Sequence, residues 1–194
     1  MINSDLAIFS LPKMISNEYK NGAITGFKEA FANHKDAHCN LTGASLSAFP
    51  FRSILLPNFI QDQDRLIEIK NAILSTEFLQ KSNDLYDFYQ SNDLKHSSHA
   101  IIQEFLKDLF SPEWINLLSK LTGLSLSSTV DVSAQKYPPR GYLQCHDDDM
   151  GNAADSRRIA FILYLVDQDW SPADGGHLQL FNTQVFLSRN YLTG

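Results

Sequence analysis

The sequence predicts an α+β fold, in which helices come first along the chain and consecutive strands follow. Three stretches between residues 62 and 123 repeat apolar residues at helical spacing. After residue 125 the period changes to that of extended chain, with β-branched and aromatic residues between turn signals. Helices followed by strands are typical of an α+β domain, or of a β-sandwich supported by helices on one side.

Length and composition fit one soluble globular domain of 194 residues, 43% of them hydrophobic. The formal net charge of −6 argues against a broad basic surface for nucleic acid, although a basic protein partner stays open. No segment is apolar enough to span a bilayer and no signal peptide is evident, so we expect a cytoplasmic or nuclear location and no membrane partner. The two cysteines, Cys39 and Cys145, are expected to be reduced thiols.

The helices differ in how well the sequence specifies them. One is expected around residues 26–32, within an N-terminal extension over 1–50 that precedes a domain over 51–194. Residues 62–75 place aspartates in the first turn and put five side chains on one face: Leu66, Ile67, Lys70, Ile73 and Leu74. Residues 99–110 repeat this spacing. Residues 111–123 add an N-cap serine, a first-turn proline and a C-cap glycine.

Four extended segments are expected after the helices. Residues 129–137 predict a strand that ends at two prolines, and residues 142–146 predict a second strand. The run RRIAFILYLV at 157–166 predicts a long strand that is buried on both faces, and residues 177–181, after two glycines, predict another.

A histidine stands directly before three aspartates in YLQCHDDDMG, residues 142–151. On an extended chain residues i and i+2 face one side, so His146 and Asp148 share a face and Asp147 points away. One imidazole and one carboxylate form two of the three ligands of the facial triad of non-haem Fe(II) oxygenases. Two other interpretations stay open: a surface turn capped by aspartates, and a carboxylate cluster that binds Mg²⁺ or Mn²⁺ in a phosphohydrolase.

The order of these segments is also that of double-stranded β-helix folds, the cupin and jelly-roll architecture. CHDDD, RRIAFILYLV and GGHLQL, with LPNFIQDQD and NDLYDFYQSNDL upstream, closely resemble a known enzyme family. It is the N-terminal catalytic domain of Fe(II)- and 2-oxoglutarate-dependent prolyl 3-hydroxylases, which act on a protein of the small ribosomal subunit. The similarity runs from about residue 51 to about residue 181, and implies a double-stranded β-helix with an N-terminal helical buttress.

The resemblance assigns roles to three residues. His146 and Asp148 match the first two iron ligands of the family. Tyr164 matches the tyrosine that holds the distal carboxylate of 2-oxoglutarate; without the resemblance, it would be interpreted as a core aromatic residue. Residues 83–94 match a loop near the active-site mouth, and we expect a solvated loop there.

The resemblance also implies the chemistry. The cofactor and cosubstrates would be Fe(II), 2-oxoglutarate and O2, with ascorbate as an optional addition. The reaction would place a hydroxyl group on C3 of a proline in a ribosomal protein, release succinate and carbon dioxide, and so affect translation.

Two features of the family pattern are absent from the sequence: a second histidine ligand on a late strand, and a following arginine that pairs with 2-oxoglutarate. His177 lies on a middle strand, where no ligand is expected. His34, His38 and Cys39 are too few for a structural zinc site, which takes four ligands. We therefore expect the C-terminal strands to be missing and the chain to be a truncated form. A catalytically inactive binding fragment is the alternative function.

Overall fold

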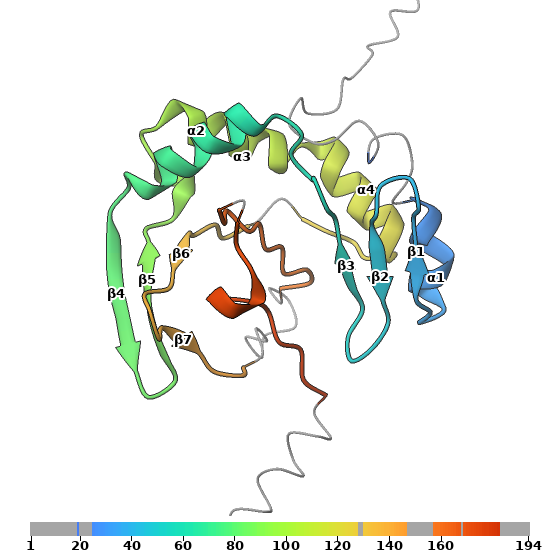
Figure 1. The fold of residues 1–194 in the computed structure, drawn as a ribbon. Coiled ribbons are helices and arrows are strands. Elements are labelled where there is room, and N and C mark those ends of the chain that lie inside the picture. Colours follow the sequence, from blue (N-terminus) through green and yellow to red (C-terminus); the bar gives the residue numbers. More distant parts are fainter. Residues whose placement is uncertain (1–18, 20–24, 128–129, 147–156, 168, 183–194) are drawn as a thin grey trace, which may run out of the picture.

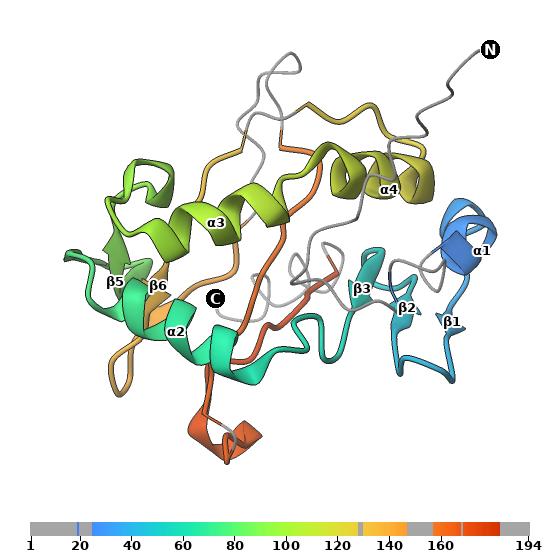
Figure 2. The same ribbon diagram turned by 90° about the horizontal axis from the view of Figure 1, so that it is seen from above.

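The fold is described here for residues 19, 25–127, 130–146, 157–167 and 169–182, in a computed structural model. Two antiparallel sheets stand on opposite sides of the molecule, and helices join them along one edge (Figure 1). The segment 157–182 runs between the two sheets (Figures 1 and 2). Helices and antiparallel sheets together agree with the predicted α+β class.

Four helices have the positions that the sequence predicts. They are α1 (Lys28–Ala32), α2 (Gln63–Leu74), α3 (Ala100–Leu109) and α4 (Pro112–Thr122). At the start of α4 the Ser111 hydroxyl accepts a hydrogen bond from the Trp114 amide at 3.3 Å, and Gly123 ends the helix with φ of 72°. The α2 and α3 helices lie side by side in both views (Figures 1 and 2).

The predicted apolar face of α2 was partly wrong. Ile69 and Ile73 are buried, whereas Ile67 is 51% and Leu74 is 49% exposed. The apolar residues of this helix allow two overlapping stripes, and periodicity does not distinguish between them. Contact with α3 selects the stripe that contains Ile69.

The first sheet pairs β1 (Ala37–His38), β2 (Ser45–Ser47) and β3 (Ser53–Leu55) in antiparallel order. Its central residue Leu46 is buried in the same hydrophobic core as Phe31 of α1 and Ile102 of α3. The part of the chain before residue 50 therefore contributes to the main core, and the proposed domain boundary at 50/51 stays a prediction.

Phe59 connects the helices of this core to the later part of the chain. Its ring centroid lies 5.3 Å from that of Trp114 in α4 and 5.5 Å from that of Phe161. Tyr19 packs on the other side of Phe59, and its hydroxyl donates a hydrogen bond to the carbonyl of Pro57. Such aromatic clusters combine a large buried area with favourable tilted ring contacts.

The second sheet contains β4 (Phe78–Asn83), β5 (Tyr86–Ser91), β6 (Gln135–Lys136) and β7 (Tyr142–Leu143). The prediction of a solvated loop over residues 83–94 was wrong, because β5 is the central strand of this sheet. The turn before it is stabilised by Asn83, whose side-chain oxygen accepts hydrogen bonds from the amides of Leu85 and Tyr86. Turn residues next to alternating aromatic and polar side chains indicate a hairpin.

The later strands are shorter than predicted or do not form. Within the two predicted strands 129–137 and 142–146, the described residues that pair with β5 as strands are those of β6 and β7. The extended chain just before β6 also contacts the end of β5, because the Ser91 amide donates a hydrogen bond to the Ala134 carbonyl. Residues 157–166 and 177–181 form no strand in the described structure. The prediction that 157–166 is buried on both faces was wrong: Ile162 and Tyr164 are about half exposed. Within the described residues no neighbouring strand pairs with this segment, so one face stays exposed while Leu163 and Leu165 on the other face pack against the core.

No helix within the described residues has the length and apolar character needed to cross a membrane.

A pair of isoleucines tests the packing of the helical layer. Ile102→Ala removes a fully buried side chain from α3 and should lower the free energy of unfolding by about 2–5 kcal/mol. Ile67→Ala on α2 should change it by less than about 0.5 kcal/mol, because that side chain is half exposed. Urea denaturation followed by circular dichroism measures both, and equal losses would contradict the α2–α3 packing.

Candidate functional site

The chain that leads to His146 is held against the β4–β5 turn. The Gln144 amide donates a hydrogen bond to the Leu85 carbonyl at 2.9 Å, and its side-chain Nε2 donates to the Asp84 carbonyl at 3.0 Å. Because these two contacts come directly after β7, they fix the direction of the chain as it leaves the sheet. The hairpin thus positions the residue that the sequence selects as the first iron ligand.

The ring of His146 is oriented by the main chain. Its Nδ1 lies 2.8 Å from the carbonyl oxygen of Gln144. A carbonyl can only accept, so this contact assigns the proton to Nδ1 and the lone pair to Nε2. That tautomer is the form in which histidine binds metals, and a hydrogen bond from the other ring nitrogen is the usual way of orienting such a ligand.

A tight turn separates β6 from β7. Lys136 faces Tyr89 and Tyr142 faces Asp87, so residues 137–141 all stand opposite the single residue Phe88. The Gly141 amide donates to the Pro138 carbonyl at 2.8 Å, and Arg140 has φ of 68°. Proline at the second position and a positive φ at the third identify a type II turn.

Gly141 allows this turn to approach β5. A Cβ atom at this position would lie 2.6 Å from Cδ of Pro138 and 2.8 Å from the carbonyl oxygen of Asp87. Both distances are far below van der Waals contact. Only glycine lets the chain loop out and then pair with β5 again before His146.

A pocket of about 450 Å³ lies beside His146. The lining comes from β4, the β4–β5 turn, β5, β6, β7 and the chain after β7. Residues that line it are Tyr86, Phe88, Gln90, Gln135, Gln144 and His146. The volume is within the range of small-ligand sites, and the lining combines apolar rings with a few polar groups, as such sites do.

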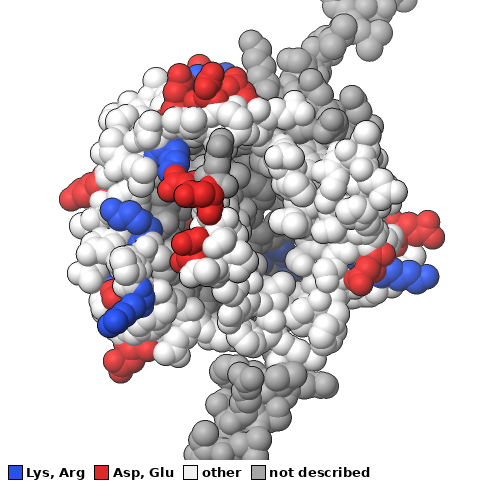
Figure 3. Space-filling model, viewed as in Figure 1, with Lys and Arg blue, Asp and Glu red and all other residues white. Residues whose placement is uncertain are grey.

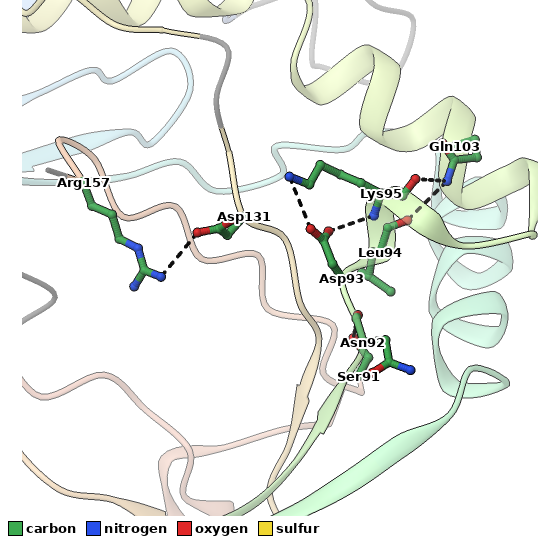
Figure 4. Close-up of polar contacts among 8 residues, drawn as sticks. All are labelled: Ser91, Asn92, Asp93, Leu94, Lys95, Gln103, Asp131 and Arg157. Atoms are coloured by element: carbon green, nitrogen blue, oxygen red, sulfur yellow. Dashed lines mark hydrogen bonds and ion pairs between the residues drawn. The ribbon is translucent and has the colours of Figure 1, made fainter. Parts of the chain in front are cut away.

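Tyr164 lies on a segment that is tied to the rest of the fold at both ends. Arg157 is 3.5 Å from Asp131 (Figure 4), and Asp167 is 2.6 Å from Lys70 of α2. Between these ion pairs Leu163 and Leu165 pack against the core, whereas Tyr164 is 46% exposed. This exposure does not fit a core aromatic residue.

The structure adds Tyr137, which the sequence had not singled out, to the surroundings of Tyr164. Burial raises the pKa of the Tyr137 phenol, and the neighbouring Tyr164 raises it further because two phenolate charges would repel. The Tyr137 ring lies 5.4 Å from that of Phe88, and its hydroxyl donates to Oε1 of Gln135 at 2.9 Å. Since Phe88 and Gln135 also line the pocket beside His146, Tyr137 connects the pocket with Tyr164. No sequence motif marks it.

The end of β5 is fastened by α3. Nε2 of Gln103 lies 3.0–3.2 Å from the carbonyl oxygens of Leu94, Lys95 and Ser97, and Figure 4 shows its approach to the first two. The Ser91 hydroxyl accepts from the Ala134 amide at 2.9 Å, which ties β5 to the chain before β6. These contacts connect the helical layer to the sheet that carries the pocket.

The second predicted iron ligand lies in a stretch that the structure does not describe. Asp148 lies outside the described residues, as do Asp147 and Asp149. His177 is exposed and its Nε2 lies 3.2 Å from the side-chain amide of Gln179. Among described residues, no group of three or more His, Cys, Asp or Glu side chains could hold a metal ion. The described residues therefore supply His146 alone from the predicted iron site.

The close approach at Gly141 can be tested by adding one methyl group. Gly141→Ala should lower the free energy of unfolding by about 1–3 kcal/mol, because the added Cβ cannot fit without moving the turn. Gly26→Ala is the matched control, since no atom lies within 4 Å of its added Cβ. Thermal unfolding compares the two variants. Similar unfolding temperatures would mean that the turn can shift to accommodate the added methyl group at little cost in stability.

The proximity of Tyr137 and Tyr164 can be tested by titration. Tyr164→Phe should lower the pKa of Tyr137 toward its usual value, because one source of the upward shift is removed while burial remains. Tyr142→Phe should leave it unchanged, since the hydroxyl of Tyr142 donates to the carbonyl of Asn83 instead. NMR titration of tyrosine labelled at Cζ measures the pKa in each variant. If the pKa of Tyr137 is the same in Tyr164→Phe as in the wild type, the placement of segment 157–167 is contradicted.

Comparison with known proteins gives matches over most of the chain. The 2OG-Fe(II) oxygenase superfamily model matches residues 132–191. The prolyl 3-hydroxylase OGFOD1 of Mus musculus is 42% identical over 143 residues, which are 74% of this chain and 25% of that protein. The prolyl 3-hydroxylase sudestada1 of Drosophila melanogaster is 32% identical over 149 residues, 73% of this chain and 26% of that protein.

A third relative differs in its named reaction. The prolyl 3,4-dihydroxylase OGFOD1 of Ostreococcus tauri is 33% identical over 113 residues, 52% of this chain and 21% of that protein. The chain spans about a quarter of the length of the first relatives it matches. These matches confirm the resemblance to prolyl 3-hydroxylases that its motifs indicate, and part of the chain matches the 2OG-Fe(II) oxygenase superfamily.

Proposed function

We propose that this chain is part of an Fe(II)- and 2-oxoglutarate-dependent prolyl 3-hydroxylase. The observation that carries the proposal is His146, whose Nδ1 is held by a main-chain carbonyl while its ring lines a pocket of about 450 Å³. This residue lies within the stretch that matches the oxygenase superfamily model. That superfamily implies a double-stranded β-helix, which further strands beyond those described would complete.

Iron would be held by His146 and Asp148. The orientation of His146 fits a metal ligand, because a hydrogen bond from one ring nitrogen to a main-chain carbonyl is a usual way of holding such a ligand. Asp148 would supply the carboxylate of a facial triad, and a third ligand would come from outside the described residues. Bound Fe(II) and O2 would supply the oxidising chemistry, in which 2-oxoglutarate is decarboxylated to succinate and a proline C–H bond gains a hydroxyl group.

The distal carboxylate of 2-oxoglutarate would be held by Tyr164, with Tyr137 beside it. Phenol hydroxyls donate strong hydrogen bonds to a carboxylate. Tyr164 is exposed rather than buried in the core, so its hydroxyl can reach a ligand. The single proton of the Tyr137 hydroxyl is donated to Oε1 of Gln135, so Tyr164 would be the donor to the carboxylate and Tyr137 its neighbour.

The protein substrate would be a prolyl residue of a small ribosomal subunit protein, modified in the cytoplasm or nucleus. The formal charge of −6 supports a basic partner. Acidic side chains gather over the end of the molecule formed by α2 and α3, and the surface is hollowed between the two sheets (Figure 3). These acidic side chains would attract a basic polypeptide. Ascorbate stays an optional addition.

A second candidate is a noncatalytic fragment that binds a partner through the same surface. The two candidates separate on one assay: 2-oxoglutarate-dependent release of succinate in the presence of a proline-containing peptide, which the fragment would not perform.

The iron site is tested by metal binding as well as by turnover. His146→Ala and Asp148→Ala should each abolish binding of Mn²⁺ followed by electron paramagnetic resonance, as well as succinate release, because each removes a ligand. Asp147→Ala should have a milder effect, since its side chain is expected on the opposite face of the strand. Circular dichroism controls for folding. Equal losses in all three variants would show that the ligand face is assigned wrongly.

The cosubstrate site is tested through affinity. Tyr164→Phe should weaken 2-oxoglutarate binding about tenfold or more, since a hydrogen bond to a charged group contributes about 1.5–3 kcal/mol. Calorimetric titration with Mn²⁺ present measures the binding constant apart from turnover. Tyr142→Phe is the control, because its hydroxyl binds the Asn83 carbonyl. Unchanged affinity in Tyr164→Phe would remove this residue from the site.

A further inference from the structure

The side chain of Asn83 orients two consecutive peptide units in the β4–β5 turn. Its Oδ1 accepts the N–H of Leu85 at 2.8 Å and the N–H of Tyr86 at 3.2 Å. A peptide unit is planar and trans, so an N–H that is fixed in this way also fixes the carbonyl of the same unit, which points in the opposite direction. The two carbonyls that Asn83 fixes are those of Asp84 and Leu85.

Gln144 binds both of these carbonyls. Its side-chain Nε2 donates to the carbonyl of Asp84 at 3.0 Å, and its main-chain amide donates to the carbonyl of Leu85 at 2.9 Å. The two peptide units of the turn therefore form two bridges from Asn83 to Gln144. Hydrogen bonds in series strengthen one another, because donation by the N–H of a peptide unit polarises its carbonyl.

The two bridges direct the carbonyl of Gln144 itself. The Cα of Gln144 carries an amide nitrogen, a side chain and a carbonyl carbon, and the turn holds the first two. The rotation that remains is that of the carbonyl about the Cα–C bond. Its oxygen lies 2.8 Å from Nδ1 of His146. The direction of the His146 ring therefore depends on the turn that Asn83 stabilises.

We propose that Asn83 and Gln144 are positioning residues for the metal ligand His146, although neither side chain would touch the metal. This inference rests on the proposed function, in which His146 holds iron. An imidazole whose second nitrogen donates to a fixed acceptor has one tautomer and one ring direction. Such a ring loses less freedom when a metal binds. The β4–β5 turn thus belongs to the metal site, although it lies on a part of the chain far from the His146 motif.

The alternative role of these contacts is to stabilise the hairpin alone. The side-chain hydrogen bonds of Asn83 and Gln144 are exposed and join neutral groups, so each contributes modestly to stability. A stabilising role predicts a lower unfolding temperature and no change at His146 in the folded protein. A positioning role predicts a change in the His146 ring, and the two roles are separated by observing that ring.

The first test observes His146 in the full chain without metal. Long-range 1H–15N NMR spectra at alkaline pH, where histidine rings are neutral, show which ring nitrogen carries the proton. The signals of His146 are identified by their loss in His146→Ala. Wild type should carry this proton on Nδ1, whereas Gln144→Met and Asn83→Ala should each give a mixture of both tautomers. Gln144→Met keeps the main-chain bond to Leu85 and removes only the side-chain donor.

The second test measures Mn²⁺ affinity by electron paramagnetic resonance. Gln144→Met and Asn83→Ala should each weaken binding about three- to tenfold. This is less than the roughly 10–100-fold loss on removing a direct partner of a metal ligand, because each side chain acts through a further group. Asn83→Asp should restore the affinity to within about twofold of wild type, since a carboxylate oxygen accepts from the same two amides.

The matched control is Gln80→Met, which removes another side-chain amide bond of the same hairpin. Nε2 of Gln80 lies 3.3 Å from Oδ1 of Asp87, and this contact does not involve Gln144. The control should leave the His146 tautomer unchanged and the Mn²⁺ affinity within about twofold of wild type, as is usual for surface substitutions.

An Nδ1 proton retained in both Gln144→Met and Asn83→Ala would overturn the proposal, as would equal losses of affinity in these variants and in Gln80→Met. If Asn83→Ala fails to fold, Gln144→Met decides by the same criterion, because it leaves the turn intact. Failure of the wild type to bind Mn²⁺ would count against the proposed function only, since the NMR comparison contains no metal.

Discussion

The candidate site depends on the pairing of one interrupted strand with the β4–β5 hairpin. Residues 135–136 and 142–143 both pair with β5, and the turn between them stands opposite Phe88. Gly141 permits this arrangement, because any side chain at that position would collide with the Asp87 carbonyl. Everything that the site uses follows from this pairing: the ring of Tyr137 packs on Phe88, and Gln144 reaches the hairpin turn.

The hairpin is itself supported by the helical layer. Gln103 of α3 binds the main chain after β5, and the Ser91 hydroxyl binds the chain before β6. These contacts are between neutral groups and depend on geometry rather than on charge, so they do not weaken with ionic strength. The ion pairs that hold segment 157–167 are more exposed, and exposed pairs contribute about 0–1 kcal/mol each. We therefore expect the hairpin side of the site to be the firmer of its two sides.

The two sides of the site differ in their side chains. The hairpin side has the apolar rings of Tyr86 and Phe88 together with amide side chains. Segment 157–167 carries Tyr164, whose exposed phenol is a neighbour of Tyr137. His146 stands on the hairpin side, held by its neighbour Gln144. A metal at this histidine would have the pocket lined by Tyr86 and Phe88 beside it.

The sequence by itself determined the features that depend on neighbouring residues: helices α3 and α4 with the caps at Ser111 and Gly123, and the motif that contains His146. Capping and periodicity act over a few residues, so one chain suffices to predict them. The tertiary structure decided which stripe of α2 is buried, that residues 86–91 form a central strand, and that Tyr137 lies near Tyr164. Among the described residues it also shows no strand that pairs with 157–166, against the prediction from the β-rich composition of this segment. Strand formation and burial depend on pairing strands and packing side chains that lie far along the chain. A local sequence pattern does not predict whether those strands and side chains are in place.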